Sequence, residues 1–195
     1  MSNEVVPVVS ERRHAAVATL TTAFSADPIF RWIYPRAADY LENFPRLMLA
    51  FGGVAFDQAT VWGFEDLTGV GMWMRPGTEP DAEATVGVLE ATADPGCLDD
   101  LMALFGQMTE AHPDYPLWYL AWLGVDCALQ GQGLGAKLMW PCLELVDGQQ
   151  LPSYLDSTNP RNVSFYQRFG FEVVGVSQSG SSPPITSMLR PARTG

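Results

Sequence analysis

A glycine-rich loop limits the folds open to this chain more than any other segment. Residues 130–136 read Gln-Gly-Gln-Gly-Leu-Gly-Ala and lie between strand-forming residues 117–125 and a helix-like segment at 138–146. Alternating glycines let consecutive backbone N–H groups turn toward one point without interference from Cβ atoms. The helix that follows adds the partial positive charge of its N-terminus. The segment therefore predicts a strand, a loop and a helix that together bind a phosphate group.

Two kinds of phosphate site are consistent with this loop. Gly131, Gly133 and Ala136 also match the G-x-G-x-x-G/A spacing of a dinucleotide-binding turn, and Asp156 lies near the offset of its ribose-binding acid. A dinucleotide-binding sheet, however, places that turn after its first strand and needs several further βα units downstream. Because few residues follow the loop, we expect a smaller sheet. Its ligand needs one pyrophosphate cradle and a slot for an extended arm, as coenzyme A does.

A second motif begins at Asn159 and reads Asn-Pro-Arg-Asn-Val-Ser-Phe-Tyr-Gln-Arg-Phe-Gly-Phe. If this stretch is helical, Asn159, Asn162 and Tyr166 fall at i, i+3 and i+7 and share one face. Gly170 is the expected C-terminal cap of that helix, and residues 171–176 are expected to form a strand. The motif therefore predicts that two amides and a phenol lie side by side.

The Gln-x-x-Gly-x-Gly loop and the Asn-(x)6-Tyr-x-x-x-Gly-Phe segment together resemble the acetyl-CoA motifs of the GNAT superfamily of N-acetyltransferases. From Leu117 to Val176 the chain also resembles the puromycin-acetyltransferase-like branch. Upstream, Ala23 to Trp32 is similar to the first helices of that branch, and Ser182 to Arg190 is similar to its closing strand. The resemblance implies an α+β fold with a mixed, mostly antiparallel central sheet. Helices flank that sheet, and one parallel pair of strands splays apart.

The resemblance also implies an acyl-CoA co-substrate, with acetyl-CoA expected first. In the family, the backbone of the central strand pairs with the pantetheine arm, and this assigns Leu123 and Val125 to the arm and the Val125 backbone to the acyl carbonyl. Both residues can also be core. The expected cofactor-binding residues are Leu123, Val125, Gln130, Gly131, Gln132, Gly133, Leu134, Gly135, Ala136, Lys137, Asn159 and Asn162.

Two of these residues have alternative roles. Lys137 follows the glycine loop, where a cation would face a pyrophosphate, but it can equally be a solvated helix residue. Asn159 is expected to hydrogen-bond the amide of the arm. It can also be an N-cap, because Pro160 suits the first helical position.

Tyr166 is the predicted catalytic acid. A phenol with a pKa of about 10 stays protonated at pH 7 and can donate its proton to a thiolate as it forms. A general base is not evident, because Tyr119 occupies the strand position that carries a catalytic glutamate in some family members. Water-relayed deprotonation or binding of a neutral amine would then suffice. His112 precedes Pro113 and is expected to be a solvated loop residue.

The acceptor is expected to contact the first half of the chain and the central strand. Residues 27–34 combine one acid with three aromatic side chains, which suits a flat or partly apolar amine. Asp27 has a second possible role as the N-cap before Pro28. The expected substrate-binding residues are Asp27, Trp32, Tyr34 and Tyr119.

These features predict an acyl-CoA-dependent N-acyltransferase, first of all an N-acetyltransferase, that acts on a small-molecule amine. One alternative is an acyltransferase that takes its acyl group from the phosphopantetheine arm of an acyl carrier protein, since such an arm fits the same slot. The lone lysine favours this alternative weakly. A non-catalytic CoA-binding protein is the other alternative, because no base is evident, although the presence of Tyr166 argues against it.

Composition supports this interpretation. The 195 residues, 47% of them apolar, suit a single domain over residues 1–195. A net charge of −11 with one lysine argues against a surface that binds nucleic acid. It favours cationic substrates such as amines. The three cysteines lack metal-ligand spacing, and we expect no metal. No apolar run suggests a membrane span and no signal peptide is evident, so a cytoplasmic monomer or homodimer is expected.

The remaining elements follow from hydrophobic periodicity and from turn residues. The third expected helix is broken or kinked at Pro45. Strands are expected at 5–9, 60–64, 70–74 and 151–155, and helices at 12–24, 40–56, 82–91 and 98–111.

Overall fold

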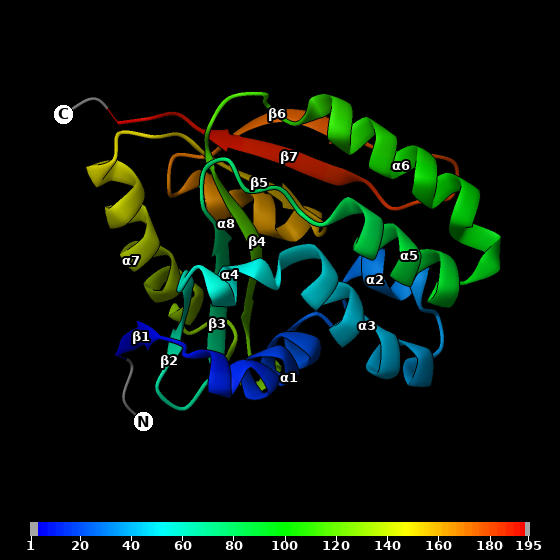
Figure 1. Cartoon of the computed structure of the whole chain (residues 1–195), viewed down its shortest axis with the longest axis horizontal. Helices are drawn as coiled ribbons and strands as arrows, with labels where there is room; N and C mark the ends of the chain where they lie inside the picture. Colours follow the sequence, from blue (N-terminus) through cyan, green and yellow to red (C-terminus); the bar gives the residue numbers. More distant parts are fainter. Residues whose placement is uncertain (1–3, 194–195) are drawn as a thin grey trace.

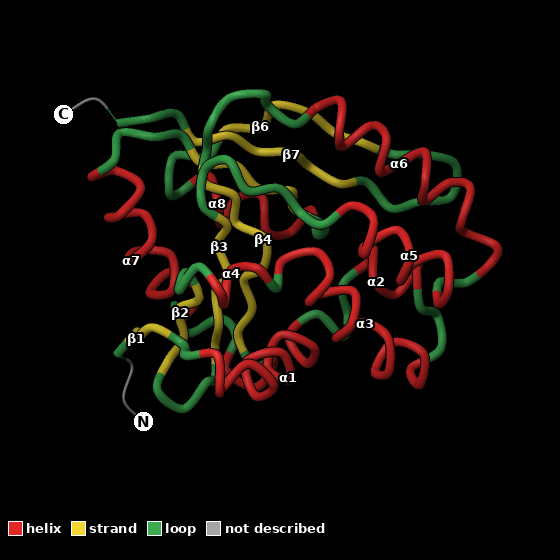
Figure 2. Tube along the Cα trace, viewed as in Figure 1, coloured by secondary structure: helices red, strands yellow, loops and turns green. Residues whose placement is uncertain are grey.

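Seven strands form one sheet in the part of the chain that the structure describes, residues 4–193 of a computed structural model (Figures 1 and 2). Their order across the sheet is β1-β2-β3-β4-β5-β7-β6. Neighbouring strands are antiparallel except for β4 and β5, which are parallel. This confirms the predicted mixed, mostly antiparallel sheet. The strands are β1 Val5–Pro7, β2 Val61–Phe64, β3 Gly69–Met74, β4 Trp118–Val125, β5 Ser153–Ser157, β6 Glu172–Ser177 and β7 Ile185–Arg190.

The parallel strands β4 and β5 separate soon after they begin. They are paired at Trp118–Ser153 and Tyr119–Tyr154, and β4 then continues to Val125 while β5 diverges from it. The register of β3 against β4 also shifts along this stretch, and a bulge of this kind bends and twists its strand. The predicted splay is therefore present. The gap between β4 and β5 lies in the middle of the sheet, where helices on both faces can reach it.

Eight α-helices cover the sheet within the described residues. On one face lie α7 and α8, and on the other lie α1 to α4, with α5 against α3 and α6 against β6 (Figure 1). The helices are α1 Arg13–Ala23, α2 Pro28–Ile33, α3 Ala37–Gly52, α4 Val54–Asp57, α5 Ala82–Thr92, α6 Leu98–Ala111, α7 Leu134–Gly148 and α8 Val163–Gln167. Short 3₁₀ turns occupy Ser10–Arg12, Pro95–Cys97, Cys127–Leu129 and Pro160–Asn162. None of the described helices combines the length and the apolar character that a membrane span requires.

Local sequence explains where α2 begins and why α3 is long. Asp27 is the N-cap of α2 and Pro28 its first residue, as expected, and such a cap is worth about 1 kcal/mol. The apolar face of α3 includes Tyr40, Phe44 and Met48, all almost fully buried. This helix runs through Pro45 to Gly52. The predicted break at the proline is therefore absent, because burial of the apolar face outweighs the loss of one backbone hydrogen bond.

Two main clusters of buried side chains correspond to the two faces of the sheet. One joins α1 to α6 with β2, β3 and β4 and contains Phe30, Phe44 and Trp122. The other joins α7 and α8 with β3, β4, β5 and β7 and contains Trp118 and Tyr166. Each large apolar side chain buried in this way contributes about 1.5–3 kcal/mol. The two clusters meet at β4, beside the gap.

Candidate active site

The glycine loop forms an open backbone turn in front of α7. Gly131 and Gly133 have φ angles of 77° and 78°, in the left-handed region that residues with a Cβ atom rarely adopt. A Cβ atom at either glycine would have no described atom within 4 Å. Gln132, between them, is exposed. The loop thus has the backbone shape and the free space of an anion cradle.

The first turn of α7 leaves backbone donors free in this cradle. Gly133 is the N-cap and supplies no side-chain cap within the described structure. The N–H groups of Ala136 and Lys137 both donate to the Gly133 carbonyl. The N–H groups of Leu134 and Gly135 have no partner within the helix, because they belong to its first turn. Lys137 is exposed in the same turn, where its charge can act on a bound anion.

The end of β4 presents a free strand edge beside the loop. The N–H group of Asp126 donates to the carbonyl of Thr68, 2.8 Å away, on the β3 side. Backbone groups alternate between the two edges of a strand, so Leu123 and Val125 turn theirs toward the gap beside β5. The side-chain amide of Gln130 donates to the Val125 carbonyl over 3.1 Å. An extended ligand can therefore pair with this edge, starting from the loop.

The second motif does not form one helix, because a 3₁₀ turn precedes α8. Asn159 has an extended backbone, with φ −127° and ψ 115°, and its Oδ1 accepts a hydrogen bond from the N–H group of Arg161 over 3.1 Å. The prediction that Asn159, Asn162 and Tyr166 share one helical face is therefore wrong. Asn159 caps the turn, the alternative role that the sequence allowed, and Asn162 is exposed.

Tyr166 lies in the buried cluster beneath α7 and α8, with 8% of its surface exposed. Among the described residues, its hydroxyl has no hydrogen-bond partner. Burial raises the pKa of Tyr166, and the nearby negative charge of Asp27 acts in the same direction. The phenol therefore carries its proton at neutral pH.

Asp27 connects the start of α2 to the end of β5. Its Oδ1 accepts hydrogen bonds from the N–H groups of Ile29 and Phe30 over 3.0 and 3.4 Å. Its Oδ2 accepts a hydrogen bond of 2.7 Å from the hydroxyl of Thr158, the residue directly after β5. Burial raises the pKa of Asp27, and the bond from Thr158 opposes this rise. Asp27 and Tyr166 thus approach the gap from opposite faces of the sheet.

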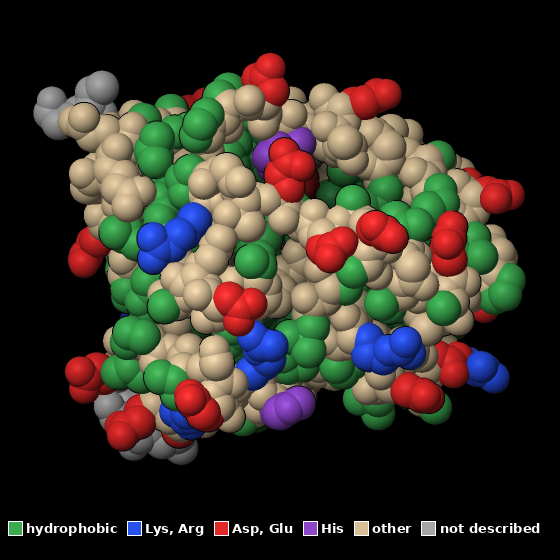
Figure 3. Space-filling view, in the orientation of Figure 1, with side chains coloured by type: hydrophobic (Ala, Val, Ile, Leu, Met, Phe, Trp, Pro, Cys, Tyr) green, Lys and Arg blue, Asp and Glu red, His purple; other side chains and the backbone are tan. Residues whose placement is uncertain are grey.

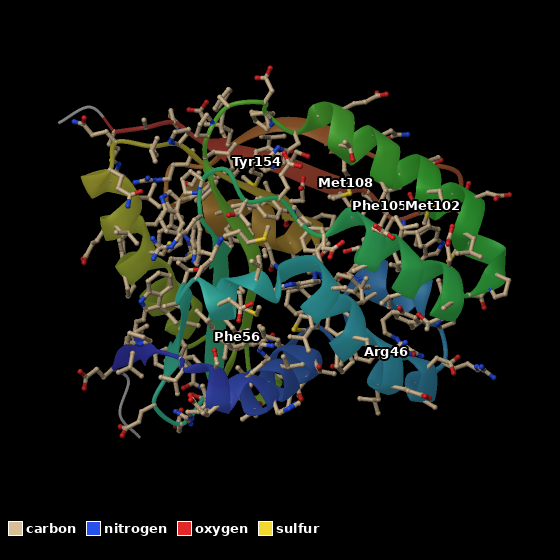
Figure 4. The ribbon with its side chains drawn as sticks, viewed as in Figure 1. Arg46, Phe56, Met102, Phe105, Met108 and Tyr154 are labelled. Carbon is tan, nitrogen blue, oxygen red and sulfur yellow. The ribbon has the colours of Figure 1, made fainter. Side chains whose placement is uncertain are left out.

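An apolar cavity of about 60 Å³ lies on the face opposite Tyr166. Its walls are apolar side chains of α2, α3 and α6 together with residues of β4 and Ile185 of β7. In Figure 4, Phe105 and Met108 project from α6 toward the middle of the molecule, and both line the cavity. Its polar lining residues are Tyr119, Asp156 and Thr158. The cavity therefore joins an apolar space to a few polar groups of β4 and of the β5 region.

Asp156 is the charged residue of this lining. Its Oδ2 accepts a hydrogen bond of 3.1 Å from the Tyr119 hydroxyl, and its Oδ1 accepts one of 2.7 Å from the Ser187 hydroxyl. Burial raises the pKa of Asp156, while the bonds from Ser187 and Tyr119 lower it and only partly compensate. Burial also raises the pKa of Tyr119. The structure thus brings Tyr119 together with a carboxyl that sequence reasoning considered only for a dinucleotide site.

Trp32 and Tyr34 do not line this cavity. The indole N–H of Trp32 donates to the Ser181 hydroxyl over 3.2 Å, and the Tyr34 hydroxyl lies 2.9 Å from the Thr92 hydroxyl in α5. Tyr34 is 1% exposed and belongs to the core. Their contact with the acceptor stays a prediction, whereas α2 reaches the cavity through Ile29 and its buried neighbours.

His112 and the inner face of α6 were not assigned to the site from the sequence. His112 is half-buried, with its ring centroid 4.8 Å from that of Tyr154 and 5.7 Å from that of Tyr119. The expectation of a solvated loop histidine is therefore wrong, because the chain folds back over β4 and β5 before it enters the sheet. The alternation of Tyr154 and Asp156 along one strand was the signal that could have placed both on one face.

The profile of the Acetyltransferase (GNAT) family matches residues 40–171, which include the glycine loop, the gap and Tyr166. The chain belongs to the GNAT acetyltransferase family. A Schizosaccharomyces pombe protein described as an uncharacterized N-acetyltransferase is 26% identical to it over 199 residues, covering 92% of this chain and 79% of that protein. The chain is thus a GNAT N-acetyltransferase family enzyme, and the family implies an acyl-CoA co-substrate.

Solved GNAT structures share this fold. A Corynebacterium glutamicum protein, described as histone acetyltransferase HPA2 and related acetyltransferase, superposes with a TM-score of 0.68 at 24% identity, covering 100% of this chain and 99% of its own. Arylalkylamine N-acetyltransferase 2 of Aedes aegypti gives 0.69 at 14% identity, with 97% and 99% covered. The polyamine N-acetyltransferase of Drosophila melanogaster, which forms N-acetylagmatine, gives 0.66 at 14% identity, with 95% and 98% covered. The likeness to the puromycin branch stays a prediction.

The described residues of this GNAT enzyme hold no group of three or more His, Cys, Asp or Glu side chains that could bind a metal ion. The expectation of a reaction without a metal stays a prediction. Acidic side chains are spread over the face of the molecule in Figure 3, in keeping with the net charge of −11. Such a surface attracts cationic ligands over long range.

Proposed function

We propose that this GNAT enzyme transfers an acetyl group from acetyl-CoA to the amine of a small molecule. One observation carries the proposal: the gap between β4 and β5 lies beside a free strand edge, an open glycine loop and a buried, protonated tyrosine. The cofactor side and the apolar cavity approach this gap from opposite faces of the sheet. This arrangement supports a reaction between one ligand from each face.

The residues that would hold the co-substrate supply mostly backbone groups. The N–H groups of residues 131–135 suit the pyrophosphate, because the two left-handed glycines open the turn and α7 adds its dipole. Lys137 stands beside them as a cation. The edge at Leu123 and Val125 suits the amides of the pantetheine arm, and the Nδ2 group of Asn159 is a further donor. Acetyl-CoA supplies the acyl group as a thioester.

Each catalytic task has a candidate group in this chain. The Val125 backbone at the strand edge is the candidate for orienting the acyl carbonyl, as the family resemblance implies. Tyr166 would donate its proton to the departing sulfur, because burial keeps the phenol protonated and its hydroxyl has no other described partner. A positioned acid of this kind contributes about 10²–10⁴-fold to a rate.

A donor and acceptor screen tests this proposal. Acetyl-CoA, longer acyl-CoAs and acylated carrier proteins are each incubated with the enzyme and a panel of primary amines, and the released thiol is measured. We expect thiol release that requires acetyl-CoA and an amine, together with an acetylated amine in the mass spectrum. Turnover with acyl carrier proteins alone would mean that a carrier protein, and not acetyl-CoA, supplies the acyl group. Binding of acetyl-CoA without turnover of any amine would favour a non-catalytic role.

A further inference from the structure

The cavity contains a carboxyl group that forms no salt bridge among the described residues. Asp156 lines the cavity and accepts hydrogen bonds from two neutral hydroxyls, those of Tyr119 and Ser187. The salt bridges of the described residues involve other acids, such as Asp147 and Asp57. A carboxylate has about four acceptor sites, more than these two hydroxyls use. A carboxylate that is partly removed from water and forms no salt bridge is costly to keep charged, which favours a cationic ligand at this site.

We propose that Asp156 binds the ammonium group of the acceptor and is the general base that removes its proton. The inference rests on the proposed function and supplies the base that the sequence did not reveal. One N–H bond of the ammonium breaks and an O–H bond forms on Asp156. The amine nitrogen then uses its electron pair to bond to the acyl carbon, and the bond from that carbon to sulfur breaks, with the bonding pair leaving on sulfur. Tyr166 gives its proton to this thiolate, and the second proton that the nitrogen loses as the amide forms returns to Tyr166 through water. Asp156 then returns its proton to solvent.

The surroundings of Asp156 suit this proton transfer. Burial raises the pKa of this carboxyl, so it is a stronger base than an exposed aspartate. The Tyr119 and Ser187 hydroxyls hold both oxygens in place. Thr158 lines the same cavity and bonds to Asp27, whose charge acts on Tyr166. The base and the acid therefore serve the two faces of one gap.

The dimensions of the cavity indicate the class of acceptor. A group the size of a water molecule needs about 10–15 Å³ of such a cavity. A cavity of about 60 Å³ therefore holds about four to six groups of this size. The walls of the cavity are largely apolar and include Ile33, Leu104 and Phe105. A short aliphatic chain that ends in a primary ammonium group fits this combination of charge, volume and apolarity. The predicted acceptors are short primary alkylamines.

The groups that face Asp156 determine what the pH dependence of the rate reports. They are Tyr119 from β4, Tyr154 from β5, Ser187 from β7 and His112 from the segment before β4. A protonated His112 lowers the pKa of Asp156. The two tyrosines stay neutral in the working range, because burial raises the pKa of each. A pH effect on the rate therefore reports on Asp156 rather than on the two tyrosines.

Calorimetry on the intact protein tests the cation site without any turnover. The probes are n-butylammonium chloride and the neutral n-butanol, each titrated into the wild type and into Asp156→Asn. We expect the substitution to weaken n-butylammonium binding at least tenfold, as for loss of a charged hydrogen bond, and to leave n-butanol binding unchanged. Asp114→Asn is the matched control, because Asp114 is exposed and outside the cavity lining; this variant should bind as the wild type does.

The pH profile of acetyl transfer to n-butylamine then tests the role as base. We expect kcat/KM of Asp156→Asn to fall about 10²-fold or more at neutral pH and to recover toward alkaline pH, where the amine is already neutral. An equal loss of kcat/KM at every pH would overturn the role of Asp156 as the general base. Unchanged n-butylammonium binding in Asp156→Asn, or none in the wild type, would overturn the cation site. Turnover of other amines would leave the proposed function standing in both cases.

Discussion

The two faces of the sheet would recognise their ligands by different means. On the face of α7 and α8, the candidate donors are backbone groups of the glycine loop and of the β4 edge, and their geometry depends on two residues with positive φ. On the face of α2, α3 and α6, the cavity is built from side chains of helices and strands far apart in the chain. Backbone recognition leaves a compact sequence motif, whereas a side-chain cavity does not.

The two faces should also differ in how strongly a single substitution affects ligand binding. The proposed cofactor face would need a backbone shape that few residues can adopt, so single substitutions there should be severe. The proposed acceptor face would depend on the volume of many apolar side chains, and each of them should change selectivity by a moderate factor. One carboxyl, Asp156, is the exception on that face, because it is ionisable and forms no salt bridge among the described residues.

The largest expected effect comes from Gly133→Val in the loop. A β-branched residue at φ 78° is strained, and the turn can relax only by moving the N–H groups out of the cradle. We expect acetyl-CoA binding, measured by calorimetry, to fall below detection while the circular dichroism spectrum stays native-like. Gly87→Ala is the control, because its Cβ also enters open space but within α5 and without a positive φ. Full affinity in folded Gly133→Val would remove the cofactor assignment.

Tyr166→Phe should have the next largest effect and should separate chemistry from binding. The substitution keeps the buried ring and removes the phenol proton on which the charge of Asp27 acts. We expect kcat to fall about 10²-fold or more, with the dissociation constant of acetyl-CoA changed less than about twofold. Wild-type turnover over the whole pH profile would show that water or another group supplies the proton.

A smaller effect is expected from Phe105→Ala, which enlarges the acceptor cavity. Loss of a side chain from the cavity wall should raise KM for short alkylamines about tenfold and lower KM for longer ones. The affinity for acetyl-CoA should stay unchanged. Met102→Ala on the same helix is the control, because Met102 is partly buried but outside the lining. Equal acceptor kinetics in the two variants would place the acceptor elsewhere. Trp32 and the strand tryptophans would then be the next sites to probe.

Asp147→Asn should change stability without changing acetyl transfer. Both oxygens of Asp147 in α7 accept hydrogen bonds from Arg190 over 2.7 and 2.8 Å, and the Arg190 side chain is 2% exposed. Removing one partner of such a pair costs about 3 kcal/mol. The Arg190 interaction lowers the pKa of Asp147, so this stabilisation is full above the ordinary aspartate pKa and is lost as pH falls. Urea unfolding should show variant and wild type converging in acid, and a constant difference would contradict the ion-pair origin.

Sequence reasoning succeeded where one local rule dominates. The strands that became β2 and β3 and the Asp27–Pro28 start of α2 were predicted from local patterns and are confirmed, and the splayed strand pair that the family resemblance implied is present. Helix α7 was expected from residue 138 but begins at Leu134, because the glycine at its N-cap already adopts the turn that starts the helix. The motif at Asn159 was expected to be one helix, and its side chain caps a 3₁₀ turn instead.

The acceptor side could not be predicted because it depends on tertiary packing. Asp156 meets Tyr119 only because β5 pairs in parallel with β4, and Ser187 joins them only because β7 lies on the far side of β5. The inner face of α6 forms one wall of the cavity. The sequence predicted only that this segment is helical, and not where the helix lies. Pairing order and helix placement are properties of the whole sheet, and no short stretch of sequence encodes them.

The most direct measurement is a crystal structure of the protein with acetyl-CoA and n-butanol bound together. The account predicts that the pyrophosphate lies on the N–H groups of residues 131–135 and that the arm runs along Leu123 and Val125. The acetyl group should then lie in the gap between β4 and β5, with the butanol hydroxyl facing Asp156 from the opposite face. An acetyl group outside the gap, or butanol outside the cavity that Asp156 lines, would contradict the claim that two ligands meet there from two faces.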